Sequence, residues 1–572
     1  MVWLDHWEDG YDQNIQNPSS TTRIWGDGDP DNGCIKCQST NQNSGRQCEP
    51  LEPAACNLQG INDVLKAGTS IVIENDVKLS GNQNNRDSSE IFYDGGDSLQ
   101  ASFPIAVSRA AFPYKSGKPN SLEAGAVEVA DTDKWGKCFV SPVGRDLFKS
   151  KSSPDPDPTS AFEETDIYLM ASQLNTVVTV PRPASDQTIE VTRSLPNGTS
   201  STTTITRSSS MSNRMFSVDV GQTIRIRNVY TGDEICANNP VQANLITGDR
   251  DSRYEMRWYS LLPKDLFSSD YFTPVTKRDG SGGAASVYLF NPAQSSITVT
   301  ETLTGGGTRN HVIPAGESLL VKLDENRDKD SGHRFRTNDG SPFFGLVLVD
   351  TSSDSGSSVD WGVPLQPTDS LTPKAIIGLG YACTGGPRLG SNANHVTCLT
   401  NSRHNPHPSS TLQPSPVSML SQITFIMLAA LHPSVTITYT VDPFICRHIL
   451  SSLHSKVWVS ALQSAAFLVD YDCDGNAEKR FPRSGTNAAL RTVIITDTKD
   501  QDMSGACITA VDGNGGPVKF AAVWGQDSTQ NAAQISELDM VRYCISSFRP
   551  LRRRWLSLPG QCRRLTAPPI FH

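Results

Sequence analysis

The sequence has no apolar run long enough to cross a membrane. The most apolar stretch of its central part, residues 423–431, is far short of the roughly 20 residues that a transmembrane helix needs. The chain also lacks a secretory leader, because residues 1–4 are followed at once by acidic residues and not by an apolar segment. We therefore predict no transmembrane segment.

Enzyme signatures are absent as well. There is no Gly-x-x-x-x-Gly-Lys phosphate loop, no His-Glu-x-x-His zinc motif and no Gly-x-Ser-x-Gly nucleophile elbow. Outside one central segment only His6, His311, His333 and His572 remain, too scattered to nominate a base or a zinc triad. We predict a non-enzymatic protein without catalytic residues. A glycosidase carboxylate pair is defined by its separation in space, so a secreted carbohydrate-active enzyme on the same scaffold is the alternative.

An excess of positive charge is also missing. The chain has 50 Lys and Arg against 60 Asp and Glu, a net charge of -10. This balance favours solubility and argues against a general binder of nucleic acid or anionic membranes. We expect no nucleic-acid partner.

Alternating strands take the place of long helical patterns. With 43 Gly and 36 Pro, the composition is that of short strands joined by many turns. One sequence pattern occurs three times, at residues 167–180, 287–300 and 456–470. It is an alternating apolar strand, a short polar turn and a second β-branched strand, which is typical of an antiparallel pair with one buried face. The chain is predicted to be all-β.

The repeats predict tandem β-sandwiches. Each hairpin is followed by a strand after a small-residue turn and by another that a proline introduces, so a unit has at least four strands. Units of about 100 to 120 residues fit β-sandwiches better than propeller blades of about 45. A propeller-like array is the alternative. The predicted repeats are residues 1–160, 161–280, a third that starts in 281–386, and 456–539.

Two segments depart from this pattern. Residues 387–455 contain no Glu, no Lys and a single Asp, but six of the ten histidines, and they lengthen the repeat spacing by about 50 residues. We predict a disordered Ser/Pro/His-rich insertion, with translated intron-like sequence favoured as its origin over a genuine insertion. Residues 540–572 carry seven Arg and no acid. They are predicted to be a disordered basic tail of similar origin, in preference to a nucleic-acid arm.

The first repeat is predicted to be incomplete. Residues 4–10 align with residues 469–475, the second strand of the last hairpin and its acidic turn. If the alignment holds, the first strand of the first repeat is missing and any leader would be lost with it. The lack of a leader then carries no information about localisation.

The thirteen cysteines are an odd number, and four of them stand close together near the front. Cys34, Cys37, Cys48 and Cys56 lie in a Gly/Asn/Gln-rich loop. In an oxidising compartment they would form two disulfides with three possible connectivities. A zinc site is the weaker alternative, because only one Cys-x-x-Cys pair is present and the other spacing does not fit a second knuckle.

One acidic turn has the spacing of a calcium loop. Asp470, Asp472 and Asp474 supply oxygen donors at the first, third and fifth positions, with glycine at the sixth. Phe481 stands where a bidentate Glu would be expected, so this is at most a half-site. The alternative is a solvated acidic turn. The remaining candidate ligands are Asn476 of the same turn and Asp497, Asp500 and Asp502 of a second one.

A further candidate turn contains Asp27, Asp29 and Asp31, although its Gly, Pro and Asn content equally suits a plain turn. Nearby acidic residues that could join it are Asp5, Glu8 and Asp9. Asn197-Gly198-Thr199 is a glycosylation sequon in a Ser/Thr-rich stretch, and Asn197 is the predicted acceptor.

Four segments together resemble one family. They are residues 5–12, residues 25–29, residues 245–249 with 252–255, and residues 522–527. The family is the group of large secreted or surface proteins that are similar to the N-terminal region of IgG Fc-binding protein. The resemblance covers most of residues 1–385 and 456–539. It implies an extracellular β-rich recognition or adhesion module without known catalytic residues. It does not imply antibody binding, which no short motif carries.

These observations predict a secreted or surface-displayed array of β-sandwiches that binds an extracellular protein or glycan. Calcium is the one cofactor that the sequence suggests. It would stiffen the acidic turns.

Overall fold

The computed structural model describes most of the chain, in separate stretches. These are residues 1–5, 22–29, 31–37, 47–51, 97–111, 125–149, 160–194, 200–248, 257–276, 283–323, 330–351, 361–377, 455–496 and 505–526, with a few short stretches and single positions besides.

The described chain is all-β, as predicted. Its sheets are built almost entirely from antiparallel strand pairs, and each helix among the described residues is a 3₁₀ turn of three residues. Within these stretches no helix has the length and apolar character that a membrane crossing requires.

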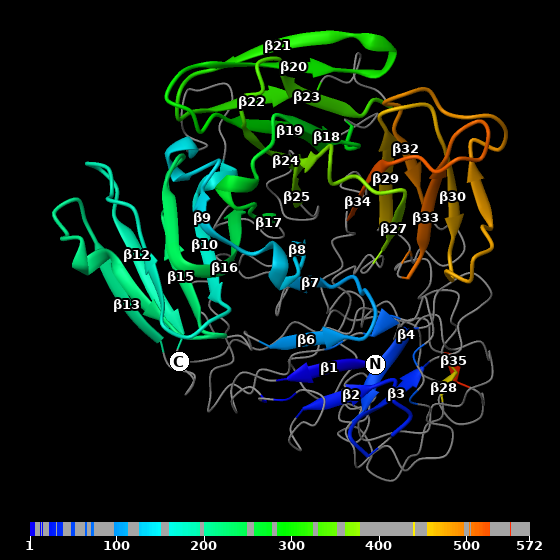
Figure 1. Cartoon of the computed structure of the whole chain (residues 1–572), viewed down its shortest axis with the longest axis horizontal. Coiled ribbons are helices and arrows are strands. Elements are labelled where there is room, and N and C mark those ends of the chain that lie inside the picture. Colours follow the sequence, from blue (N-terminus) through cyan, green and yellow to red (C-terminus); the bar gives the residue numbers. More distant parts are fainter. Residues whose placement is uncertain are drawn as a thin grey trace, which may run out of the picture.

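The module in the middle of the chain, module 3, shows the repeated topology most completely (Figure 1). Its six strands, β19 to β24, are counted here as first to sixth in chain order. One sheet has the order β21-β20-β23, which are the third, second and fifth strands. The other has the order β22-β19-β24, which are the fourth, first and sixth. The strands are β19 (Gly283–Phe290), β20 (Ile297–Thr302), β21 (Thr308–Ile313), β22 (Ser318–Lys322), β23 (His333–Thr337) and β24 (Phe344–Thr351).

Module 4, near the C-terminal end of the described chain, has the same order. Its sheets are β31-β30-β33 and β32-β29-β34. The strands are β29 (Ser455–Ala461), β30 (Ala466–Asp470), β31 (Lys479–Phe481), β32 (Val493–Ile495), β33 (Cys507–Val511) and β34 (Phe520–Gln526). The repeats are therefore two-sheet modules, as predicted, and not single-sheet propeller blades.

Module 2 follows the same plan but merges its two sheets. Its fifth and sixth strands are one continuous strand of 15 residues, β16, which pairs with β11 through its first half and with β10 through its second. A hairpin, β12 and β13, is added beside β15. The strands are β10 (Glu164–Ala171), β11 (Thr176–Thr179), β12 (Ile189–Ser194), β13 (Ser200–Ile205), β14 (Met215–Val218), β15 (Thr223–Arg227) and β16 (Glu234–Gly248).

Additional strands join successive modules. Three of them, β9, β18 and β27, each add to the sheet of the following module by pairing with its fifth strand. β9 lies before residue 161, where the predicted second repeat begins, and pairs with β16 of module 2. The connecting strands are β9 (Gly136–Val140), β17 (Arg257–Ser260), β18 (Asp270–Thr273), β25 (Trp361–Pro364), β26 (Gln366–Pro367) and β27 (Lys374–Ile376).

Module 1 contains the remaining N-terminal strands. β2, β1 and β6 form one sheet, β7 pairs with β8, and β3, β4 and β5 form a small third sheet. The strands are β1 (Val2–Asp5), β2 (Arg23–Trp25), β3 (Cys34–Cys37), β4 (Gln47–Leu51), β5 (Ser70–Ile71), β6 (Ser98–Ala101), β7 (Ser108–Ala111) and β8 (Gly125–Glu128).

The predicted insertion and tail lie mostly outside the described residues. Only the start of β29 and one pair of two-residue strands, β28 (Tyr439–Thr440) and β35 (Arg549–Pro550), fall within them. Their predicted disorder stays a prediction.

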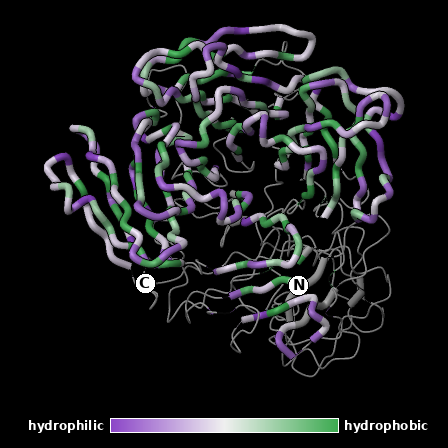
Figure 2. The backbone as a smooth tube through the Cα atoms, viewed as in Figure 1, coloured by the Kyte–Doolittle hydropathy of each residue, from purple (hydrophilic) through white to green (hydrophobic). Residues whose placement is uncertain are grey.

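The cores follow from the alternation of the strands. Val287, Leu289, Val299 and Phe335 are fully buried in a core that modules 2 and 3 share, whereas module 4 has its own core around Val457 and Phe467. Apolar residues alternate with polar ones along these strands (Figure 2). This period of two is what buries one face of each sheet.

Candidate metal centre

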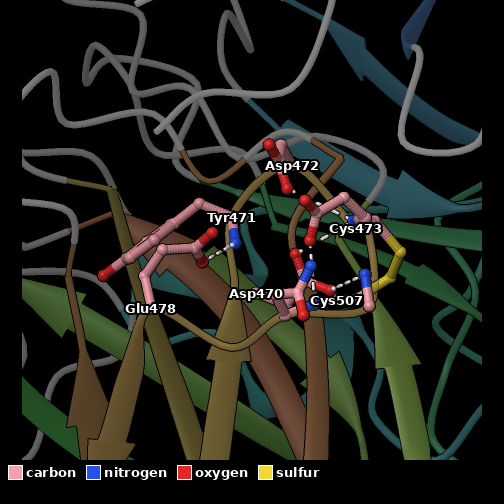
Figure 3. Close-up of a disulfide and its surroundings, with 9 residues drawn as sticks. Asp470, Tyr471, Asp472, Cys473, Glu478 and Cys507 are labelled. Atoms are coloured by element: carbon pink, nitrogen blue, oxygen red, sulfur yellow. Dashed lines mark hydrogen bonds between the residues drawn. A yellow bond between two sulfur atoms is a disulfide. The ribbon is translucent and has the colours of Figure 1, made fainter. Parts of the chain in front are cut away.

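The turn between β30 and β31 brings four carboxylates together. Asp470, Asp472, Asp474 and Glu478 each place an oxygen within 4.8 Å of the others. Figure 3 shows Asp470, Asp472 and Glu478 at this turn. Oxygen donors from a short, mostly exposed loop are the ligands that Ca²⁺ prefers.

The backbone of this turn is shaped by its own side chains. Asp470, 8% exposed, accepts hydrogen bonds from the backbone N–H groups of Asp474 (3.2 Å) and Gly475 (2.8 Å). Gly475 has a φ of +101°, a conformation that only glycine adopts readily. The chain therefore reverses around Asp470 and carries Asp472 and Asp474 back toward it.

Glu478 completes the cluster from the far side of the turn. Its Oε2 accepts a 2.8 Å hydrogen bond from the backbone N–H of Tyr471, which holds the carboxylate over the start of the loop. The Lys479 ammonium lies 5.0 Å from the centre of the Tyr471 ring. No described Lys or Arg forms an ion pair with the four carboxylates.

A disulfide fastens the turn to the neighbouring strand. Cys473 lies between two of the acidic residues and is bonded to Cys507 of β33, with 5.1 Å between their Cα atoms (Figure 3). Cys507 is also the backbone partner of Asp470 in the β30–β33 ladder. The loop is therefore anchored at both its first ligand and its middle.

The carboxylates repel one another in the absence of a cation. Partial burial raises the pKa of Asp472, and the nearby Asp474, Asp470 and Glu478 carboxylates raise it further, against the hydrogen bond from the Asp474 backbone. A raised carboxyl pKa means that the ionised form is disfavoured at this position. A divalent cation would relieve that cost.

The structure brings together three of the ligands predicted from the sequence. Asp470, Asp472 and Asp474 converge, and Asn476 donates its backbone N–H to Asp474. Glu478 was not predicted as a ligand, because a calcium loop of this spacing carries its glutamate at the twelfth position and Glu478 occupies the ninth. The other predicted ligands, Asp497, Asp500 and Asp502, lie outside the described residues.

The second predicted site does not form a comparable cluster among the described residues. Asp27 accepts the backbone N–H of Asp29, and Asp29 accepts that of Asp31, each at 3.0 Å. These carboxylates follow the turn one after another and do not meet at one point. Asp63 accepts the backbone N–H groups of Gly26, residue 27 and Gly28.

Burial raises the pKa of Asp63 to about 6, an effect that neighbouring Asp27 increases. Of the nearby acids, Asp5 accepts hydrogen bonds from the Asp12 backbone and the Thr22 hydroxyl. Glu8 and Asp9 lie outside the described residues.

The predicted cysteine loop is described only in its strands. β3 and β4 pair so that Cys37 stands opposite Cys48 and Cys34 opposite Leu51. Cys56 lies outside the described residues, as does the sequon residue Asn197. Among the residues that the structure describes, the disulfides are Cys473–Cys507 and Cys138–Cys236, a cross-strand pair whose Cα atoms lie 4.1 Å apart. Neither pair was predicted from the sequence.

A second polar cluster is buried inside module 3. Glu301, fully buried, accepts hydrogen bonds from His333 Nδ1 at 2.8 Å and from His311 Nε2 at 2.9 Å. The Arg309 guanidinium is 3.7 Å away. Burial alone would raise the pKa of Glu301, but the two histidine hydrogen bonds and the positive charges around it hold that pKa at about 2.

The chain was compared with protein-family models, curated proteins and solved structures. No protein-family model matches the chain. No curated protein matches it. Among solved structures, a lectin from Pleurotus ostreatus in complex with GalNAc aligns with 41% of this chain and 86% of its own, at 12% identity and a TM-score of 0.10. A score this low does not indicate a shared fold.

Proposed function

We propose that the protein is an extracellular or cell-surface recognition and adhesion array that binds a protein or glycan and performs no catalysis. In this proposal a calcium ion held by the loop of Asp470, Asp472, Asp474 and Glu478 stiffens module 4. The convergence of these four carboxylates at 4.8 Å or less is the observation that carries the calcium part.

The location of the proposed calcium ion explains what it would stabilise. The loop connects β30 to β31, and through Cys473–Cys507 it is fixed to β33. These three strands are one complete sheet of the module. An ion at this point would hold the exposed end of that sheet in a single conformation, which is what a surface that recognises a partner needs.

The ligand chemistry favours calcium over other common ions. The cluster offers only oxygen atoms, and its two outer members, Asp474 and Glu478, are exposed. Zinc and copper sites use imidazole or thiolate groups, whereas calcium accepts several carboxylates in a flexible geometry.

Two features support an extracellular setting. The chain has two disulfides within the described residues, and such bonds persist mainly in oxidising compartments. Its segments resemble secreted or surface proteins of the group similar to IgG Fc-binding protein.

A calcium titration of the melting temperature tests the proposal. Because calcium would bind the folded loop only, stability should rise by about 2.7 kcal/mol at a concentration 100 times the dissociation constant. For a module of this size we expect an increase of several degrees. Asp472→Asn should abolish the increase.

Asp512→Asn is the matched control. Asp512 also caps an acidic turn of module 4, accepting the backbone N–H groups of Asn514 and Gly516 at 2.8 Å each, but it is not in the carboxylate cluster. This variant should keep the calcium response. No increase of the wild-type melting temperature at millimolar calcium would rule out the ion.

A further inference from the structure

One edge strand of module 2 is built almost entirely of serine and threonine. β13 ends the nine-stranded sheet and pairs with β12 alone among the described strands. Residues 200–204 are all Ser or Thr, and Ile205 completes the strand. The outer edge of β13 therefore presents backbone N–H and C=O groups that no described strand pairs with. Such an edge is a template for a further strand.

β13 is regular and well anchored on its inner side. Its residues pair one to one with residues 189–194 of β12, and no bulge interrupts the register. Ile205 is fully buried in the core that modules 2 and 3 share, whereas Ser200, Thr202 and Thr204 are exposed. Because bulges are one means by which proteins blunt an edge, this unbroken strand can accept a partner along its whole length.

Edge strands of modules 3 and 4 carry features that oppose such pairing. β21, at the edge of its sheet, contains Arg309 and His311. β31, also at an edge, contains Lys479 and Arg480 and is followed by Pro482. Charged residues and proline at an edge keep sheets from joining. β13 has neither.

The side chains of β13 make the strand complementary to itself. A hydroxyl group both donates and accepts hydrogen bonds, so two copies of one Ser/Thr strand can satisfy each other. The inner side already shows such a contact, because Thr192 Oγ1 and Thr202 Oγ1 lie 2.9 Å apart across the β12–β13 ladder. A twofold axis brings each residue of the strand close to the same strand of the other copy. Like charges would repel there, and β13 has no charge.

We propose that β13 pairs with β13 of a second copy of this chain. The two strands would run antiparallel about a twofold axis and join the two module 2 sheets into one continuous sheet. Figure 1 shows β13 as the outermost labelled strand at the left of the molecule, on the side away from modules 3 and 4. Those two modules therefore do not obstruct the approach of a second copy.

This inference goes beyond the proposed recognition function and does not depend on the calcium site. Self-association is measured on the protein alone, without calcium or another ligand, so the two proposals fail separately. Two paired strands of this length make a small contact, and we therefore expect a weak dimer.

Sedimentation velocity of the full chain, from micromolar to submillimolar concentration, tests the pairing. We expect a monomer–dimer equilibrium, with slower hydrogen exchange at the amides of residues 200–205 as the dimer forms. Thr202→Lys should raise the dissociation constant of the dimer about fivefold or more, because like charges would face each other across the twofold axis. Thr298→Lys is the matched control. Thr298 is an exposed threonine of β20, which has a strand on both sides, and this variant should leave the dissociation constant unchanged.

A charge exchange separates pairing from any effect on folding. Thr202→Glu alone should weaken the dimer as Thr202→Lys does. A mixture of the two variant proteins should recover a dimer with one copy of each, because opposite charges then lie across the axis. A monomer at every concentration, protection located elsewhere, an equal loss in Thr298→Lys, or no recovery in the mixture would each overturn the proposal.

Discussion

At the scale of single residues, two groups of buried charge in the described chain are held by opposite charges or hydrogen-bond partners. Arg225 and Asp166 face each other on neighbouring strands of module 2, with their side chains 1% and 2% exposed and 2.9 Å between Nε and Oδ2. Glu301 of module 3 is held by two histidines. Removing one member of such a group leaves its partner without compensation in a medium of low polarity.

Glu301→Gln tests this at one position. A folded-state pKa of about 2, below the ordinary value of 4.5, means that the ionised group favours the folded state above pH 4.5. The contribution is lost as the pH falls from about 4.5 through 2. We expect the variant to unfold with a free energy lower by roughly 3 kcal/mol at pH 6.

Urea denaturation at pH 6 and pH 2 measures this difference, which should shrink at the lower pH. Glu317→Gln is the control, since Glu317 is an exposed glutamate of the same module. A variant as stable as wild type at pH 6 would contradict the role given to the Glu301 cluster.

The residue scale also shows what sequence reasoning could reach. The Asp470, Asp472 and Asp474 spacing was readable because all three lie in one turn of known geometry. Glu478 was not recognised, because its approach depends on a hydrogen bond to the Tyr471 backbone. The Glu301 cluster joins three different strands, and no local pattern in the sequence brings such residues together.

At the scale of strands and turns, the disulfide of the acidic turn is the most informative element. Cys473 and Cys507 are separated by 34 residues, and closing a loop of that length in the unfolded chain stabilises the fold by about 3 to 4 kcal/mol in the chain-entropy model. Because Cys473 stands between two of the proposed calcium ligands, the bond also restricts the conformations of the loop.

Cys473→Ser with Cys507→Ser should therefore lose both stability and calcium affinity. We expect a loss of about 2 to 4 kcal/mol in unfolding free energy and weaker calcium binding by isothermal calorimetry. Cys138→Ser with Cys236→Ser removes the other disulfide, which is distant in sequence from the acidic loop, and should lose stability alone. Equal calcium affinities in the two double variants would show that the Cys473–Cys507 disulfide does not contribute to calcium binding.

Strand topology was partly predictable. The strands β10 and β11, β19 and β20, and β29 and β30 follow from alternation and polar turns, which are local signals. Their predicted pairing as hairpins was wrong. The two strands of each pattern do not pair with each other, and in modules 3 and 4 they lie in different sheets, because alternation shows which face of a strand is buried but not which strand lies beside it. The disulfide partners and the continuous β16 did not follow. Cys138 and Cys236 are 98 residues apart, and β16 passes through Pro240, a residue that usually ends a strand in sequence reasoning.

At the scale of the whole molecule, modules 3 and 4 meet closely (Figure 1). Trp361 of β25 and Trp458 of β29 pack with their ring centres 5.2 Å apart. A side chain at Gly525 of β34 would come within 2.7 Å of the Trp361 ring. The glycine is thus required by the contact between the two modules.

Gly525→Ala should weaken that contact. Overpacking of this kind costs about 1 to 3 kcal/mol, and we expect the melting of module 4 to separate from that of module 3 in differential scanning calorimetry. Gly513→Ala, at a turn where an added carbon meets nothing within 4 Å, should leave the profile unchanged. A single undisturbed transition for Gly525→Ala would show that the contact does not couple the modules.

The Cys473–Cys507 bond has a mechanical consequence. If the protein tethers a surface under load, a module that yields lengthens by the chain it releases, at roughly 3.5 Å for each residue. The disulfide closes a segment of 34 residues that unfolding cannot extend. The released length is therefore shorter by on the order of 120 Å. Module 4 would then unfold in a short step, and the proposed calcium ligands Asp474 and Glu478 would stay inside the segment that the disulfide closes.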